Sequence, residues 1–155
     1  MDMKQLAPIV TILVSLIGGV YFLYKEYRKR QLKNRKNLSG EWTNEGDVTR
    51  SHLETHYMDV SLSIDTEDGE ITGLVASRNL QTGASYNYIS ANGHFKYKSG
   101  IVTLRMSNRG LTVIGKVKIS GTKKQLMWKM IGEENDLIPA KTLLHRNPIK
   151  DTRAG

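Results

Sequence analysis

The hydrophobic pattern of this chain changes once, near Leu38. Before that point, Leu6–Tyr24 is a run of nineteen residues without a formal charge. Nineteen helical residues reach about 28 Å, close to the hydrocarbon thickness of a bilayer. After Leu38, apolar and polar residues alternate, which is the period of half-buried antiparallel strands. The pattern therefore predicts one transmembrane α-helix followed by an all-β domain.

The alternation divides into eight predicted strands, most of them separated by short connections that contain Gly, Asn or Asp. Short connections favour hairpins, and closing eight meandering strands into a barrel removes the two exposed sheet edges. We expect an eight-stranded, up-and-down, lipocalin-like antiparallel β-barrel over residues 38–146, with residues 147–155 as a C-terminal tail. The polar segment Asp47–Thr55 is predicted to be a loop or short helical turn across one barrel mouth. The predicted strands are Gly40–Gly46, His56–Thr66, Glu70–Arg78, Ser85–Tyr97, Ile101–Ser107, Leu111–Ser120, Lys124–Ile131 and Ala140–Arg146.

One predicted strand serves as an example of the inward face. In Leu111–Ser120 the positions that we expect to face the core are Leu111, Val113, Gly115, Val117 and Ile119, which alternate with Thr112, Lys116, Lys118 and Ser120. An ionised side chain at Val117 would then be placed in apolar surroundings.

Positive charge is concentrated directly after the apolar run. Lys25–Lys36 contains seven Lys or Arg residues and one Glu, a balance of +6, whereas residues 37–155 carry only +2. The folded domain is therefore not a basic DNA-binding or RNA-binding domain. Because cations remain on the cytoplasmic side of a membrane, the N-terminus is expected outside and the barrel in the cytoplasm. The segment 25–37 is predicted to be a basic linker, either as a topology determinant or in contact with anionic lipid headgroups.

Motifs for chemistry are absent. The chain has no cysteine, which agrees with a reducing compartment, and it has no phosphate-binding loop or nucleophile elbow. His52 and His56 are four residues apart, but His56 begins a predicted strand, so we expect no metal site. The acidic cluster Glu133–Asp136 is expected to be a solvated loop. No catalytic residue, metal or cofactor is predicted, and the protein is not expected to be an enzyme.

Candidate ligand-binding residues are polar or aromatic side chains that could converge at the barrel mouth or in its interior. Aromatic faces stack on nucleobases, and Arg matches phosphate geometry. For each residue the alternative is ordinary strand surface. Arg105 lies between Leu104 and Met106, where an unpaired cation is costly unless the interior is wet or binds an anion. The candidates are Arg78, Tyr86, Asn87, Tyr88, Arg105, Arg109, Trp128, Lys129 and Thr142.

Gly40-Glu41-Trp42 resembles the Gly-x-Trp motif that opens lipocalin-type barrels. In that family the tryptophan closes one end of the barrel and packs beneath a basic residue after the last strand. The resemblance implies that Arg146 lies over Trp42 in a cation–π contact, with a structural role for both residues.

The anchor, basic linker and barrel together resemble the membrane-anchored β-barrel effectors of bacterial anti-phage cyclic-nucleotide signalling, the CBASS and Panoptes systems. Leu38-Ser39-Gly40-Glu41-Trp42 and the strand order carry this resemblance. It implies that the barrel binds a cyclic dinucleotide and controls homo-oligomerisation and disruption of the inner membrane. The alternative is a membrane-tethered lipocalin-like carrier or scaffold that binds an apolar ligand or a protein partner. Converging Arg and Tyr side chains would favour a nucleotide, and a dry apolar lining would favour a lipid or no interior ligand.

Overall fold

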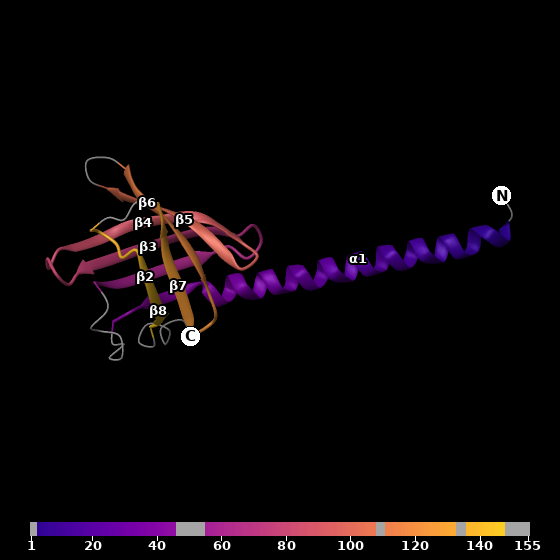
Figure 1. Ribbon diagram of the computed structural model, residues 1–155, viewed down its shortest axis with the longest axis horizontal. Helices are drawn as coiled ribbons and strands as arrows, with labels where there is room; N and C mark the ends of the chain where they lie inside the picture. The colour runs from indigo at the N-terminus through magenta and orange to yellow at the C-terminus, as the bar shows by residue number, and fades with distance from the viewer. Residues whose placement is uncertain (1–2, 46–54, 108–110, 133–135, 148–155) are drawn as a thin grey trace.

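The structure is a computed structural model that describes residues 3–45, 55–107, 111–132 and 136–147, with side chains described from residue 11 onward. A long helix, α1 (Met3–Leu38), leads into a closed antiparallel barrel in which each strand pairs with its neighbours in sequence (Figure 1). The strands are β1 (Gly40–Thr43), β2 (His56–Ile64), β3 (Glu70–Asn79), β4 (Ser85–Lys96), β5 (Ser99–Ser107), β6 (Leu111–Gly121), β7 (Gln125–Ile131) and β8 (Lys141–Arg146).

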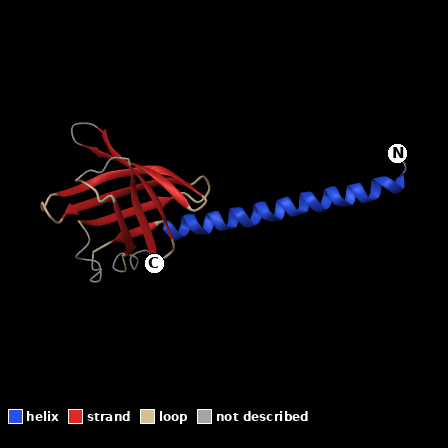
Figure 2. Cartoon of the chain, viewed as in Figure 1, coloured by secondary structure: helices blue, strands red, loops and turns tan. Residues whose placement is uncertain are grey.

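The predicted eight-stranded up-and-down barrel is confirmed, and the observed strands match the predicted ones to within a few residues at their ends. Figure 2 shows the division into one helix and one β domain. The largest difference is β1, which ends at Thr43 rather than at Gly46; residues 46–54, and with them most of Asp47–Thr55, lie outside the described residues. No helix in the described part of the chain combines the length and the apolarity needed to cross a membrane.

The segment predicted as a basic linker is helical, because α1 continues to Leu38 and docks onto one end of the barrel. Leu38 is 1% exposed and belongs to the core. The buried Arg35 guanidinium donates to the carbonyl oxygens of Thr66, Glu67 and Asp68 at 2.8, 2.7 and 3.3 Å. These three carbonyls belong to the β2–β3 turn, so one cation of the basic block holds the helix to the barrel rather than facing solvent.

A second set of contacts joins α1 to the β4–β5 turn. Tyr27 stacks on Tyr97 with 5.1 Å between the ring centroids. Asn34 Nδ2 donates to the Tyr97 carbonyl oxygen at 3.0 Å. Tyr27, close behind the apolar run, is thus a docking residue of the helix.

The expected closure by Trp42 and Arg146 is confirmed. The Arg146 guanidinium carbon lies 4.9 Å from the Trp42 ring centroid, and the indole Nε1 donates to the Leu38 carbonyl oxygen at 3.0 Å. Arg146 Nη2 also donates to the carbonyl oxygens of Asn37 and Ser39 at 2.9 and 2.8 Å. The last strand therefore supplies the cap for the end of α1, whose final carbonyls have no partner within the helix.

The inward face predicted for the sixth strand is only partly right. Val117 and Ile119 are fully buried as expected, whereas Leu111 and Val113 are 72% and 54% exposed. The cause is a β-bulge: Leu104 pairs with Gly115 and Arg105 pairs with Val113, so Ile114 is an extra residue on β6. An extra residue shifts the alternation by one position, so the side chains beyond it exchange faces.

Candidate functional site

The barrel interior is filled with side chains. Its core is a single apolar cluster that includes Trp42, Phe95, Leu104, Val117 and Trp128, each 1% exposed or less. Apolar side chains therefore fill the described interior, which does not provide the Arg- and Tyr-lined chamber that a nucleotide would need.

Polar groups enter the interior only near the barrel end opposite α1, as far as the described residues show. Asn44 Nδ2 donates to the His56 carbonyl oxygen at 2.8 Å and to Thr142 Oγ1 at 3.3 Å, and Asn44 Oδ1 accepts the Met58 amide at 2.7 Å. These bonds continue the pairing between β1 and β2 beyond Thr43. They give the buried Thr142 hydroxyl a structural role.

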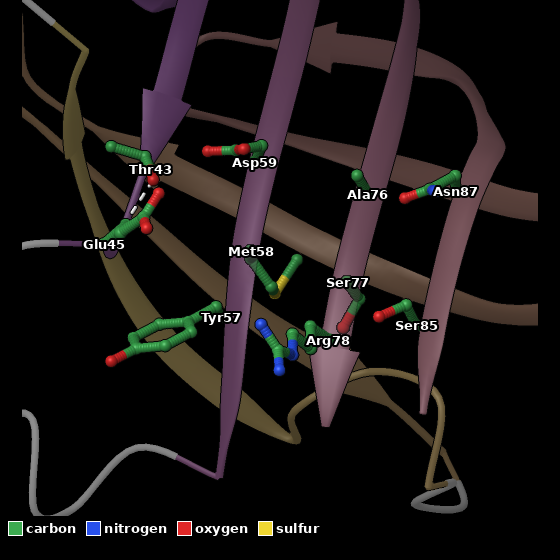
Figure 3. A pocket seen from close by; sticks show the side chains of 10 residues that line it. All are labelled: Thr43, Glu45, Tyr57, Met58, Asp59, Ala76, Ser77, Arg78, Ser85 and Asn87. Carbon is green, nitrogen blue, oxygen red and sulfur yellow. Dashed lines mark hydrogen bonds between the residues drawn. The ribbon is translucent and has the colours of Figure 1, made fainter. Parts of the chain in front are cut away.

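A groove lies on the outside of the barrel, over the ends of β1–β4 farthest from α1 (Figure 3). Its volume is about 230 Å³, and it adjoins a second hollow of about 490 Å³. Asp59, Ala76 and Asn87 line both parts. We call these two hollows together the outer groove. Its other lining residues include Glu41, Glu45, Tyr57, Leu74, Arg78, Ser85 and Tyr88.

A β-bulge on β4 builds the outer groove. Val75 pairs with Ile89 and Ser77 pairs with Tyr86, so both Asn87 and Tyr88 stand opposite the single residue Ala76. Both side chains are exposed on the outer surface. Tyr88 has a φ of +65° and is 79% exposed. A bulky residue with this backbone conformation is unusual and costs about 1–3 kcal/mol, and such strain is concentrated at functional sites.

The register of the strands determines the remaining lining. Tyr57 on β2 pairs with Arg78 on β3, which pairs with Ser85 on β4, so the three form one row across the groove. Figure 3 shows the Arg78 guanidinium between the Tyr57 ring and Ser85. A phenol, a guanidinium and a hydroxyl are therefore presented together.

Charge in the outer groove is mixed. Arg78 is the cation among its described lining residues, and Glu41, Glu45 and Asp59 bring carboxylates to its β1–β2 side. The Glu45 amide donates to Thr43 Oγ1 at 3.1 Å, which fixes the turn after β1. A site of this composition can contact one phosphate through Arg78, stack a base on a tyrosine, and accept hydrogen bonds from base N–H groups through its carboxylates.

The structure brings together three of the nine sequence-predicted site residues, Arg78, Asn87 and Tyr88, in the outer groove. Tyr86 adjoins them and packs partly buried against the core. The others are dispersed: Trp128 and Thr142 are buried inside, Lys129 is exposed on β7, Arg105 lies on β5, and Arg109 is outside the described residues.

Of the two alternatives for Arg105, the barrel interior and the strand surface, the structure shows the strand surface. Val102 and Leu104 are fully buried, and Arg105 takes the next position, paired with the exposed Val113. It therefore points outward, where a guanidinium is hydrated and requires no wet interior. Its neighbours Leu104 and Met106 suggested burial only because sequence proximity does not distinguish the two faces of a strand.

Sequence reasoning missed Tyr57, Asp59 and Glu45. Alternation along β2 could have placed Tyr57 and Asp59 on the outer face, but a sequence without known register does not reveal that they adjoin Arg78.

His56, considered as a metal ligand, is buried, and its ring nitrogens lie 2.9 Å from Thr55 Oγ1 and the Asp136 carbonyl oxygen. His52 and residues 133–135 of the acidic cluster are outside the described residues. Within the described part of the chain no group of three metal-ligating side chains occurs.

The chain matches no protein-family model, no curated protein and no solved structure.

Proposed function

We propose that this protein is a membrane-anchored, non-enzymatic effector of anti-phage defence whose barrel binds a cyclic dinucleotide in the outer groove and thereby controls assembly in the inner membrane. The observation that carries the binding site is the convergence of Arg78, Asn87, Tyr57 and Tyr88 around the β4 bulge. The defence role rests on the architectural resemblance to the CBASS and Panoptes effectors.

The chemistry of the outer groove suits a nucleotide better than an apolar cargo. Tyr57 and Tyr88 offer aromatic faces for bases, and Arg78 offers a bidentate contact for a phosphate. Asp59 and Asn87 provide acceptors for base edges. The filled interior is compatible with this proposal only if the ligand binds outside the barrel, as the outer groove allows.

Membrane anchoring is proposed from the sequence. The apolar run Leu6–Tyr24 includes residues 6–10, whose side chains lie outside the described ones, and the basic block follows it directly. A reporter that is active only outside the cytoplasm, fused after residue 155, should give no signal in a bacterial host, and the same reporter fused before residue 1 should be active. The reverse result would overturn the topology.

Calorimetry of the full chain in detergent against a panel of cyclic dinucleotides tests the ligand. Arg78→Ala should weaken binding about ten- to a hundredfold, because a charged hydrogen bond contributes about 1.5–3 kcal/mol. Tyr88→Gly should also weaken binding while leaving thermal stability unchanged or higher, since glycine adopts a positive φ without strain. Lys129→Ala, on β7 away from the groove, is the matched control and should bind normally.

Two results would contradict the proposal. Wild-type protein that binds no member of the panel would remove the nucleotide, and unchanged affinity in both Arg78→Ala and Tyr88→Gly would remove the outer groove as its site.

The second candidate is a membrane-tethered scaffold for a protein partner. The observation in its favour is the exposure of Leu74, Tyr88, Leu111 and Val113 on the barrel surface. The carrier form of this alternative is disfavoured by the side chains that occupy the described interior. Wild-type protein that binds no cyclic dinucleotide in the calorimetry would favour the scaffold function.

A further inference from the structure

The first part of α1 exposes large apolar side chains on every side of the helix. Leu16, Ile17 and Val20 are 60%, 69% and 66% exposed, and the other large apolar residues from Ile12 to Tyr24 are exposed as well. Successive helical residues point about 100° apart, so these side chains surround the helix axis. Figure 1 shows this part of α1 projecting away from the barrel. A helix that is apolar all round requires apolar surroundings, which the bilayer of the proposed function supplies.

The β4–β5 turn extends along α1 toward this apolar run. Asn34 Nδ2 holds the carbonyl oxygen of Tyr97, and the Tyr97 ring reaches along the helix to stack on Tyr27. Gln31 Nε2 donates to the Tyr27 hydroxyl at 2.7 Å, so the stacked rings lie beside the helical segment between residues 27 and 31. At 1.5 Å per residue, this segment begins about 5 Å and ends about 10 Å beyond Tyr24.

Two lysines flank Tyr97 in the same turn. The side chains of Lys96 and Lys98 are both exposed. Lys98 Nζ lies 5.3 Å from the centroid of the Tyr97 ring. Because that ring is stacked on Tyr27, the contact places the Lys98 ammonium group beside the first two helical turns after the apolar run.

The position of this ammonium group matches the depth of a lipid headgroup layer. A bilayer about 40–45 Å thick contains a hydrocarbon core of about 30 Å, so each headgroup layer is about 5–8 Å deep. With Tyr24 at the edge of the hydrocarbon, Tyr27 lies within this layer. The potential of anionic headgroups extends about 8 Å further at physiological ionic strength. Lys98 is therefore within electrostatic reach of headgroup phosphates.

Exposed cations on α1 lie at the same level. Lys25, Arg28 and Lys29 follow the apolar run directly, and their side chains are exposed. We call Lys25, Arg28, Lys29, Lys96 and Lys98 together the basic rim. The rim joins one helix to one turn of the barrel, so it depends on the docking of α1 and not only on the basic sequence.

The neighbouring β2–β3 turn carries the opposite charge and lies farther from the apolar run. The carbonyl oxygens of Glu67 and Asp68 in this turn accept hydrogen bonds from Arg35. Arg35 is eight residues beyond Tyr27, or about 12 Å along the helix. The lysines are thus advanced toward the apolar run and the carboxylates are set back, an order of charge that complements an anionic surface.

We propose that the basic rim binds the headgroup phosphates of anionic phospholipids, so that the β4–β5 edge of the barrel rests on the membrane surface. The inference names the lipid partner of the proposed membrane anchor and rests on that anchor. Contact on one side of α1 sets the direction in which the helix tilts. Because the outer groove lies at the barrel end farthest from α1, it stays open to solvent in this orientation.

Fluorescence quenching in lipid nanodiscs tests the contact, since the chain has no native cysteine and can be labelled at one site. The full chain carries an NBD fluorophore at Ser99→Cys, beside Lys98. The discs contain phosphatidylcholine, alone or mixed with phosphatidylglycerol, and a lipid with a nitroxide on its headgroup. Quenching should be stronger in the mixed discs, and added salt should remove the difference by screening. Gln81→Cys, exposed in the β3–β4 turn at the opposite barrel end, is the control label and should be quenched little in either disc.

Charge variants in the Ser99→Cys background identify the lysines. Lys96→Gln/Lys98→Gln should lower the ratio of lipid-bound to detached turn in the mixed discs about thirtyfold, which corresponds to about 2 kcal/mol. Lys129→Gln/Lys141→Gln removes the same charge from β7 and β8 and should leave quenching unchanged. These two lysines pair across the strands and are both exposed.

Equal quenching at Ser99→Cys in the two kinds of disc would overturn the proposal, as would unchanged quenching in Lys96→Gln/Lys98→Gln. Retention at high salt separates this failure from failure of the anchor. A chain that stays in the discs at high salt but shows equal quenching refutes the headgroup contact alone. A chain that high salt strips from the discs refutes the anchor and the contact together.

Discussion

Arg146 stands over Trp42 at 4.9 Å and donates to the Asn37 and Ser39 carbonyl oxygens, so a single side chain joins the last strand to the first strand and to the end of α1. Arg146→Ala should lower the free energy of unfolding by about 2–4 kcal/mol, because a cation–π contact and two charged hydrogen bonds are lost together. Chemical denaturation measures this directly. Arg146→Lys should recover only part of the loss, because Lys cannot bond both carbonyls while stacking on the indole. Full stability of Arg146→Ala would show that the closure is dispensable.

Removal of Arg35 should loosen the helix from the barrel. Arg35→Ala leaves the carbonyls of Thr66, Glu67 and Asp68 without their donor, at an expected cost of about 2–3 kcal/mol. We expect residues 25–155 to unfold at a higher temperature than residues 38–155, although the shorter piece should still give a β-rich circular dichroism spectrum. Lys36→Ala is the control for Arg35→Ala, since the Lys36 side chain is exposed. Identical melting of the two pieces would contradict docking.

Two substitutions on β6 distinguish its faces. Val117→Asp should prevent folding, because the buried side chain must either remain charged in the core or become protonated at a cost of several kcal/mol. Val113→Asp should fold normally in the isolated barrel, because the bulge places Val113 outside. Thermal melts followed by circular dichroism provide the measurement. A folded Val117→Asp protein, or an unfolded Val113→Asp protein, would show that the two faces of β6 are assigned incorrectly.

Asp65 should contribute a pH-dependent term to stability. Its pKa is lowered by hydrogen bonds from the backbone amides of Glu67 and then Asp68, with Arg35 as a minor electrostatic cause. Since the pKa is lower in the folded state, the stabilisation is present above the unfolded pKa of about 4 and is lost as the pH falls through the folded value. Melting temperatures from pH 2 to 7 should show a steeper acid decline in the wild type than in Asp65→Asn. Parallel curves would refute the effect.

The strands and the closure of the barrel follow from local features of the chain. Alternation with period two predicts the eight strands, since each needs one apolar face, and short connections predict their order. The contact of Trp42 with Arg146 is implied by the resemblance of Gly40-Glu41-Trp42 to the motif of lipocalin-type barrels, in which a basic residue after the last strand covers the tryptophan. Burial of Val117 follows from the same alternation.

Which side chains meet depends instead on contacts between distant parts of the chain. A bulge adds one residue and exchanges faces, so Leu111 and Val113 lie outside although they are in phase with the buried Val117 and Ile119, and Asn87 and Tyr88 open a groove at Ala76. The apolar neighbours of Arg105 do not assign it to a face. Arg35 differs from the other cations of its block only because the β2–β3 turn lies beside it. Register and docking arise from contacts distant in sequence, which local periodicity does not encode.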